Sequence, residues 1–111
     1  MVTAETAVVL PVLVLVLAAG IWVLACLSGQ LRCVDAARSA ARAAARGDAD
    51  SLVRTAGLVI APSGARVGLQ TQDDKVTVIV EAVIRPFGAG LAGLPGMPVS
   101  ARASALREER P

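Results

Sequence analysis

A long uncharged stretch from Thr6 to Leu31 constrains the fold of this chain more than any other feature. As an α-helix rising about 1.5 Å per residue it would be roughly 39 Å long, which exceeds the roughly 30 Å hydrocarbon core of a bilayer. The stretch therefore predicts a membrane-spanning helix. Glu5 directly precedes it, and an ionisable group at the mouth of a membrane helix is costly enough to indicate a function.

A cleaved secretory signal peptide is the alternative for this segment. Signal peptides carry a basic n-region, a shorter apolar core and a small-residue cleavage site. Here the first basic residue is Arg32, and the apolar run is longer than a typical h-region. We therefore expect residues 1–31 to remain as a transmembrane segment and residues 32–111 to form a small separate domain.

The composition argues against several classes of function. The chain has one Trp, one Phe, no Tyr and no His, so it lacks stacking platforms for bases and the commonest general base and metal ligand. We expect no catalytic residues, no metal site and no cofactor. Nucleic acids and small-molecule substrates are not expected as partners.

The membrane helix is expected to continue past the bilayer. The segment from Leu31 to Arg46 is rich in alanine and contains no Gly or Pro, which favours an unbroken helix ending at Gly47. Two faces are predicted. One is a solvated stripe of Arg38, Arg42 and Arg46, for which anionic lipid headgroups are a lesser alternative. The other is an apolar seam of Leu27, Leu31, Val34, Ala37 and Ala41.

The rest of the chain predicts a short helix followed by strands. Asp48 or Asp50 is the expected N-cap of the helix, and Pro62 to Gly64 ends it. Its expected apolar side comprises Leu52, Val53, Ala56, Val59 and Ile60.

Alternating apolar residues then predict three strands. The first two form a hairpin around Asp73 and Asp74, and the third runs from about Val99 to Leu106. Between them, Pro86 to Pro98 is an expected loop whose Phe87, Leu91, Leu94 and Met97 suggest an apolar neighbour. A charged tail ends the chain. The predicted fold is α+β, a long helix joined to a three-stranded antiparallel sheet that the helices must cover.

The N-terminal segment, MVTAETAVVLPVLVLVL, resembles the TadE-like minor pilins or pseudopilins of Tad/Flp type IV pilus systems. In that family a basic leader ends in Gly, a prepilin peptidase cuts after it, and the fifth mature residue is Glu. The matching positions are Glu5, the Leu10-Pro11 pair and Gly20. No Gly precedes Met1, so either the chain is already processed or that route does not apply.

The resemblance implies a structural subunit of a pilus or a related secretion-type filament. Such a protein is held in the bacterial cytoplasmic membrane by one helix, with its C-terminal domain outside the cytoplasm, before it enters a cell-surface fibre. Its implied partners are other pilin-like subunits, the pilus assembly machinery, the lipid bilayer and, if a leader precedes Met1, prepilin peptidase.

Under the resemblance, Glu5 pairs with the free N-terminal ammonium of a neighbouring subunit, at its Met1. Such a pair neutralises two charges within an apolar bundle. The alternative is an interfacial Glu5 that only favours the positive end of the helix dipole.

Four further residues of the long helix have a functional and a plain interpretation. Pro11 and Gly20 can let the helix bend, or Pro11 is simply a tolerated membrane proline. Cys26 is most simply a small apolar residue. Cys33 is a candidate intersubunit thiol if the domain faces an oxidising compartment.

The arginine pattern supports a rival function. Positive charge follows the apolar span rather than preceding it, and the positive-inside rule would then keep the domain in the cytoplasm. The rival is a single-pass membrane adaptor whose small domain binds a cytoplasmic partner and never polymerises. A removed basic leader would reverse this expectation.

Overall fold

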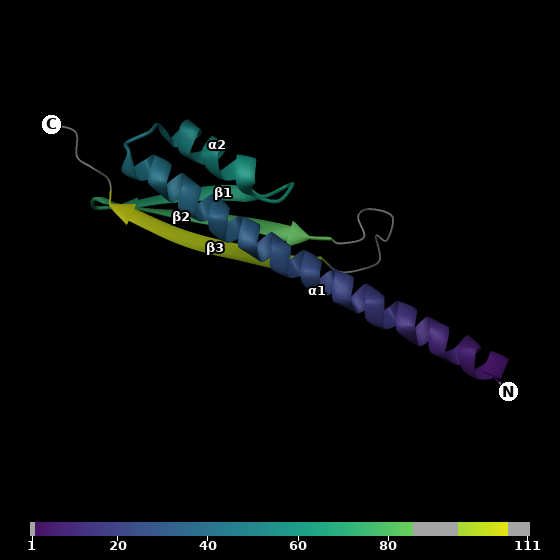
Figure 1. Cartoon of the computed structure of the whole chain (residues 1–111). Helices are drawn as coiled ribbons and strands as arrows, with labels where there is room; N and C mark the ends of the chain where they lie inside the picture. The colour runs from purple at the N-terminus through teal and green to yellow at the C-terminus, as the bar shows by residue number, and fades with distance from the viewer. Residues whose placement is uncertain (1, 86–95, 107–111) are drawn as a thin grey trace.

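The structure, a computed structural model, describes residues 2–85 and 96–106. It is an α+β fold in which a long helix and a short one cover one face of an antiparallel sheet, as predicted, and the N-terminal half of the long helix projects away from the rest (Figure 1). The elements are α1 (Val2–Ala45), α2 (Asp50–Ile60), β1 (Arg66–Gln72), β2 (Lys75–Ile84) and β3 (Met97–Leu106). Met1, the loop residues Phe87, Leu91 and Leu94, and the charged tail lie outside the described residues.

The helix α1 is continuous over 44 residues, which confirms that the apolar helix extends through the alanine-rich segment. Gly47 ends it with a φ of 82°, a conformation that glycine adopts without steric cost. The amide of Gly47 donates to the carbonyl of Ala44 at 3.0 Å, and that of Asp48 to Ala43 at 3.2 Å. These bonds satisfy carbonyls that the end of a helix otherwise leaves unpaired.

The sheet has the order β1-β2-β3, with both pairs antiparallel. The predicted hairpin is confirmed, because β1 and β2 join through a tight turn in which Asp73 has a φ of 55°. Aspartate tolerates this left-handed conformation better than most residues. The third strand begins at Met97, two positions before the expected Val99.

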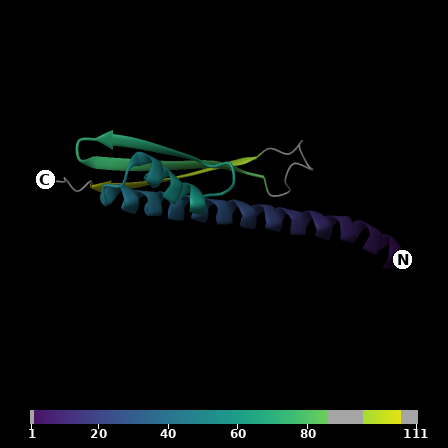
Figure 2. The ribbon, with the colours of Figure 1, turned by 90° about the horizontal axis from the view of Figure 1, so that it is seen from above.

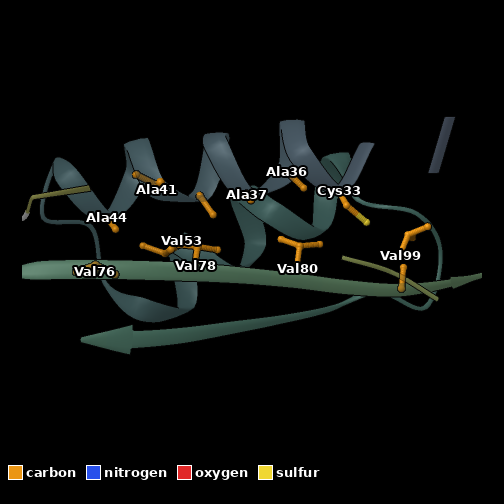
Figure 3. Packing of buried hydrophobic residues seen from close by; sticks show 13 residues of the cluster. Cys33, Ala36, Ala37, Ala41, Ala44, Val53, Val76, Val78, Val80 and Val99 are labelled. Atoms are coloured by element: carbon orange, nitrogen blue, oxygen red, sulfur yellow. The ribbon is translucent and has the colours of Figure 1, made fainter. Parts of the chain in front are cut away.

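Small side chains on α1 let the helix lie close to the sheet. Alanines and Cys33 of α1 point at the valines of β2 (Figure 3). The fully buried positions include Ala36, Ala37 and Ala40, each at 0% exposure. A Cβ built on Gly57 of α2 would lie 3.5 Å from the Ala40 Cβ and 3.2 Å from the Val67 Cγ2, so the two helices and β1 meet without spare room.

The predicted apolar seam of α1 is wrong at its membrane end. Ala37 and Ala41 are buried as expected, but Leu27 and Leu31 are 56% and 65% exposed. The buried face instead passes through Cys33 and Ala40, roughly 120–180° around the helix from these leucines at about 100° per residue. Arg38, Arg42 and Arg46 are exposed as predicted.

The predicted N-cap of α2 is also wrong. The N-cap is Ala49, which makes no side-chain capping hydrogen bond. Asp50 is the first helical residue. Asp48 lies one residue before the N-cap, and its carboxylate accepts a hydrogen bond from the Arg46 guanidinium at 3.2 Å.

The buried side of α2 is narrower than predicted. Val53 and Gly57 are buried and Ala56 is half-buried, whereas Leu52 and Val59 are 59% and 79% exposed. Leu52 and Val59 lie roughly 100–120° around the helix from Val53, at about 100° per residue, and so point away from α1 and the sheet.

Candidate membrane span and assembly site

The first half of α1 has no protein around it. Among the described residues, α1 is the one helix long and apolar enough to cross a membrane, and its most apolar 18-residue window has a mean hydropathy of 2.8 and is 0% buried inside the protein. The core helix of a water-soluble protein would be mostly covered. This segment therefore presents its leucines and valines to whatever surrounds it, which makes it a candidate membrane span.

Glu5 lies at the N-terminal end of this span. Its side chain is exposed in the first turn of α1, where unpaired backbone N–H groups give the helix end a partial positive charge that favours a carboxylate. Its expected partner, the N-terminal ammonium at Met1 of a neighbouring subunit, lies outside the described residues. The pairing stays a prediction.

Pro11 and Gly20 both lie inside helical backbone. Figure 2 shows α1 as one continuous helix that curves towards its N-terminal end. A Cβ built on Gly20 would meet nothing within 4 Å, so packing inside this chain does not require glycine there. The role of Pro11 and Gly20 in bending the helix during assembly stays a prediction.

The two thiols differ in access. Both cysteines are free, Cys26 is half-buried, and Cys33 is 0% exposed between α1 and the sheet (Figure 3). Burial raises the pKa of the Cys33 thiol above its ordinary value, because desolvation disfavours the thiolate. A disulfide to a neighbouring subunit would require the domain to open, so the structure argues against the intersubunit role considered for Cys33.

We expect Cys33 to resist a thiol reagent in the folded protein and to react once the domain is unfolded. The measurement is the rate of maleimide labelling in a Cys26→Ala variant, with and without denaturant. Rapid labelling of the native protein would contradict the buried position.

The raised pKa of Cys33 also makes the stability of the fold depend on pH. Its contribution to the free energy of unfolding is complete below the pKa of the unfolded thiol, and it is lost as the pH rises from that value through the pKa of the folded thiol. Stability of the Cys26→Ala variant should therefore fall more steeply above about pH 9 than stability of a variant that also carries Cys33→Ala.

The structure also brings together residues that the sequence analysis did not group. A hollow at the end of the sheet nearest the membrane span is lined by residues of the α2–β1 loop, β2 and β3, among them Arg66 and Arg85. These arginines are far apart in the chain. The one available signal was the greater length of the second predicted strand relative to the first, which leaves the end of β2 without a β1 partner.

Comparisons with known proteins assign this chain to a family. Residues 1–42 match the family of TadE-like proteins. Over 104 residues the chain is 38% identical to a Mycobacterium tuberculosis protein named as an apoptosis inhibitor, an alignment covering 94% of this chain and 77% of the relative. No solved structure matches the chain significantly. The family match begins at the N-terminus and extends through the exposed apolar span into the buried alanine face, and on these grounds the chain belongs to the TadE-like family.

Proposed function

We propose that this chain is a minor pilin-like subunit of a Tad/Flp-type pilus or a related secretion-type filament. Before assembly it is held in the bacterial cytoplasmic membrane by α1, with residues Thr6 to Leu27 in the bilayer and the α+β domain outside the cytoplasm. During assembly α1 leaves the lipid and packs among the helices of other pilin-like subunits. In this proposal the protein performs no chemistry and acts as a structural part.

One observation carries the proposal. A continuous helix presents an uncovered apolar segment with a single carboxylate, Glu5, near its N-terminal end. A segment that only anchored a domain would not need a charge at that position, because a charge near hydrocarbon is costly unless it is paired. A bundle of parallel helices supplies both an apolar environment for the segment and, at the neighbouring N-terminus, a cation for the carboxylate.

The rival adaptor function rests on the arginines that follow the span. Arg32, Arg38 and Arg42 lie at the C-terminal side of the apolar segment, where the positive-inside rule favours the cytoplasm. The adaptor and the pilin therefore place the α+β domain on opposite sides of the membrane. The relative's name describes an effect on apoptosis, and nothing among residues 2–85 and 96–106 connects this chain to that effect.

Labelling from outside the cell should reach the α+β domain. Cys33 is too buried to report, so we choose a Ser51→Cys change at an exposed position in the first turn of α2, combined with Cys26→Ala. We expect a membrane-impermeant maleimide to label this thiol in intact cells to the same extent as in lysed cells. The Cys26→Ala variant alone is the matched control and should stay unlabelled in both.

Labelling of the Ser51→Cys thiol only after lysis would place the domain in the cytoplasm. That result would reject the pilin-like proposal and favour the adaptor.

A further inference from the structure

The sheet ends at the depth where α1 leaves the membrane. The Gln30 Nε2 donates a hydrogen bond to the Ser100 carbonyl oxygen at 2.8 Å, and the Ile84 side chain lies directly against Gly29. Both contacts lie inside the uncharged stretch that ends at Leu31. The end of the sheet formed by the end of β2 and the start of β3 is therefore the membrane-facing end of the domain.

The number of α1 residues between Thr6 and Gly29 sets the depth of these contacts in the bilayer. About 20 residues cross the hydrocarbon core, so a span that starts at Thr6 leaves it near Ala25. The headgroup layer adds roughly 5–7 Å on each side, which is four or five residues at about 1.5 Å each. Gly29 and Gln30 thus lie within the headgroups, and the edge of the sheet that contacts them lies there too.

Basic side chains gather at this end. Arg32 follows Gln30 by two positions on α1, and Arg85 follows the last residue of β2. Arg66 and Arg85 line the same hollow, next to the loop that starts at Pro62. All three arginines are exposed.

The opposite end of the domain carries the acidic groups. The α1–α2 connection and the hairpin turn lie there, and they contribute Asp48, Asp50, Asp73 and Asp74. Glu81 of β2 lines the same hollow as Arg66 and Arg85 and is the register partner of Arg66. The nearest carboxylate on α1 is Asp35, one turn beyond Arg32. Arg46, Arg54 and Lys75 also lie at the far end, so the two ends differ only by a small excess of basic groups at the membrane-facing end and of acidic groups at the far end.

Exposed apolar side chains accompany the arginines. Val83 of β2 is 50% exposed and Met97 of β3 is 44% exposed. Both strands have these ends towards the projecting half of α1 (Figure 1). The far end also carries exposed apolar residues, Leu52 and Leu106, and there Lys75 is the register partner of Leu106. A surface that combines arginines with exposed apolar side chains is typical of proteins that rest on anionic lipid.

We propose that this membrane-facing rim, formed by Arg32, Arg66, Val83, Arg85 and Met97, docks the domain on the anionic phospholipid headgroups of the bilayer that α1 spans. The arginines contact lipid phosphates, and the apolar side chains enter the boundary between headgroups and acyl chains. The docked domain holds α1 at a fixed depth and tilt until assembly extracts it. The proposal rests on the membrane-anchored state of the proposed function and not on polymerisation.

The rim should respond to lipid charge. Near an anionic surface each arginine favours the docked state about fivefold, so Arg66→Gln with Arg85→Gln should lower the docked-to-undocked ratio about 25-fold. The matched control is Arg42→Gln with Arg102→Gln, which removes the same charge at exposed positions away from the rim.

The measurement uses the full chain, one copy per lipid nanodisc, with a fluorophore on a Ser63→Cys thiol in the Cys26→Ala background. Ser63 lines the hollow beside the rim. Nitroxide-labelled lipid headgroups should quench the fluorophore in discs of phosphatidylglycerol, and less in phosphatidylcholine. The quenching should weaken with added salt, because exposed charges are screened. It should be lost in the rim variant and retained in the control.

Equal quenching in both lipids, or a rim variant that behaves like the control, would overturn the proposal. Quenching that changes only in discs holding two copies, whatever the lipid, would show that the acidic end of a neighbouring copy covers the rim, and would also overturn it. Protection of Cys33 from maleimide shows that a variant keeps its native core. If a variant fails this control, the proposal is tested by the lipid and salt series on the protein with the wild-type rim alone. Because no filament is involved, failure here leaves incorporation into fibres as a separate question.

Discussion

Replacing Glu5 with alanine is expected to leave the protein in the membrane and remove it from the pilus. If the carboxylate pairs with a neighbour's N-terminal ammonium, the change leaves that ammonium unpaired in an apolar bundle at a cost of roughly 3–5 kcal/mol. With a tenfold change per about 1.4 kcal/mol, incorporation should fall by about two to three orders of magnitude. Membrane insertion should be unaffected, because the variant segment is more apolar.

The measurement is the amount of protein in sheared extracellular fibres relative to the membrane fraction. Asp35→Ala is the matched control, since it removes one exposed carboxylate from the same helix beyond the span, and it should incorporate normally. If Glu5 served only the helix dipole, its loss would matter by less than about 1 kcal/mol. Equal amounts of wild type and Glu5→Ala in the fibre would therefore refute the pairing.

Enlarging Ala40 is expected to destabilise the α+β domain strongly. Ala40 is 0% exposed and lies against Gly57 of α2, so a leucine there has no space and must push α2 away from α1. Overpacking of this kind lowers the free energy of unfolding by about 3 kcal/mol. For a domain of this size the midpoint should drop by roughly 12–24 °C.

Thermal unfolding in detergent, followed by circular dichroism, measures this effect. Arg42→Leu introduces the same side chain on the same helix at an exposed position and should change the midpoint little. An Ala40→Leu protein as stable as the Arg42→Leu protein would mean that α1 and α2 do not pack as closely as described.

The elements of the fold were predictable because each depends on local sequence. The absence of charge up to Leu31 and the alanine content beyond it favour one long helix whatever surrounds it. The alternation around Asp73 likewise specifies a hairpin, because successive residues of a strand face opposite sides.

The buried face of α1 was not predictable in the same way. Leu27 and Leu31 are more apolar than Ala36 or Ala40, so a ranking by hydrophobicity favours them. The closeness of the sheet decides otherwise, since only small side chains fit between two backbones this near each other. The N-cap of α2 was misplaced because the helix begins at Asp50, so that Ala49 and neither aspartate occupies the cap position.

The candidate site was predictable only at its N-terminal end. Glu5 stands out because it is the one charge before a long uncharged segment. The rim depends instead on the register of the strands and on where the sheet meets α1. The pairing of Arg66 with Glu81 and the contact of Ile84 with Gly29 bring Arg66 and Arg85 towards the bilayer, and neither is visible from local sequence.

Quantitative mass spectrometry of sheared filaments tests whether this chain is a filament subunit. In a host cell that assembles Tad pili, we predict that peptides of this chain occur in the purified filament fraction, and that they disappear from it when pilus assembly is blocked while the membrane pool remains. Recovery of the whole protein in the membrane of cells that make abundant filaments, with none in the filaments, would contradict its role as a pilin-like subunit.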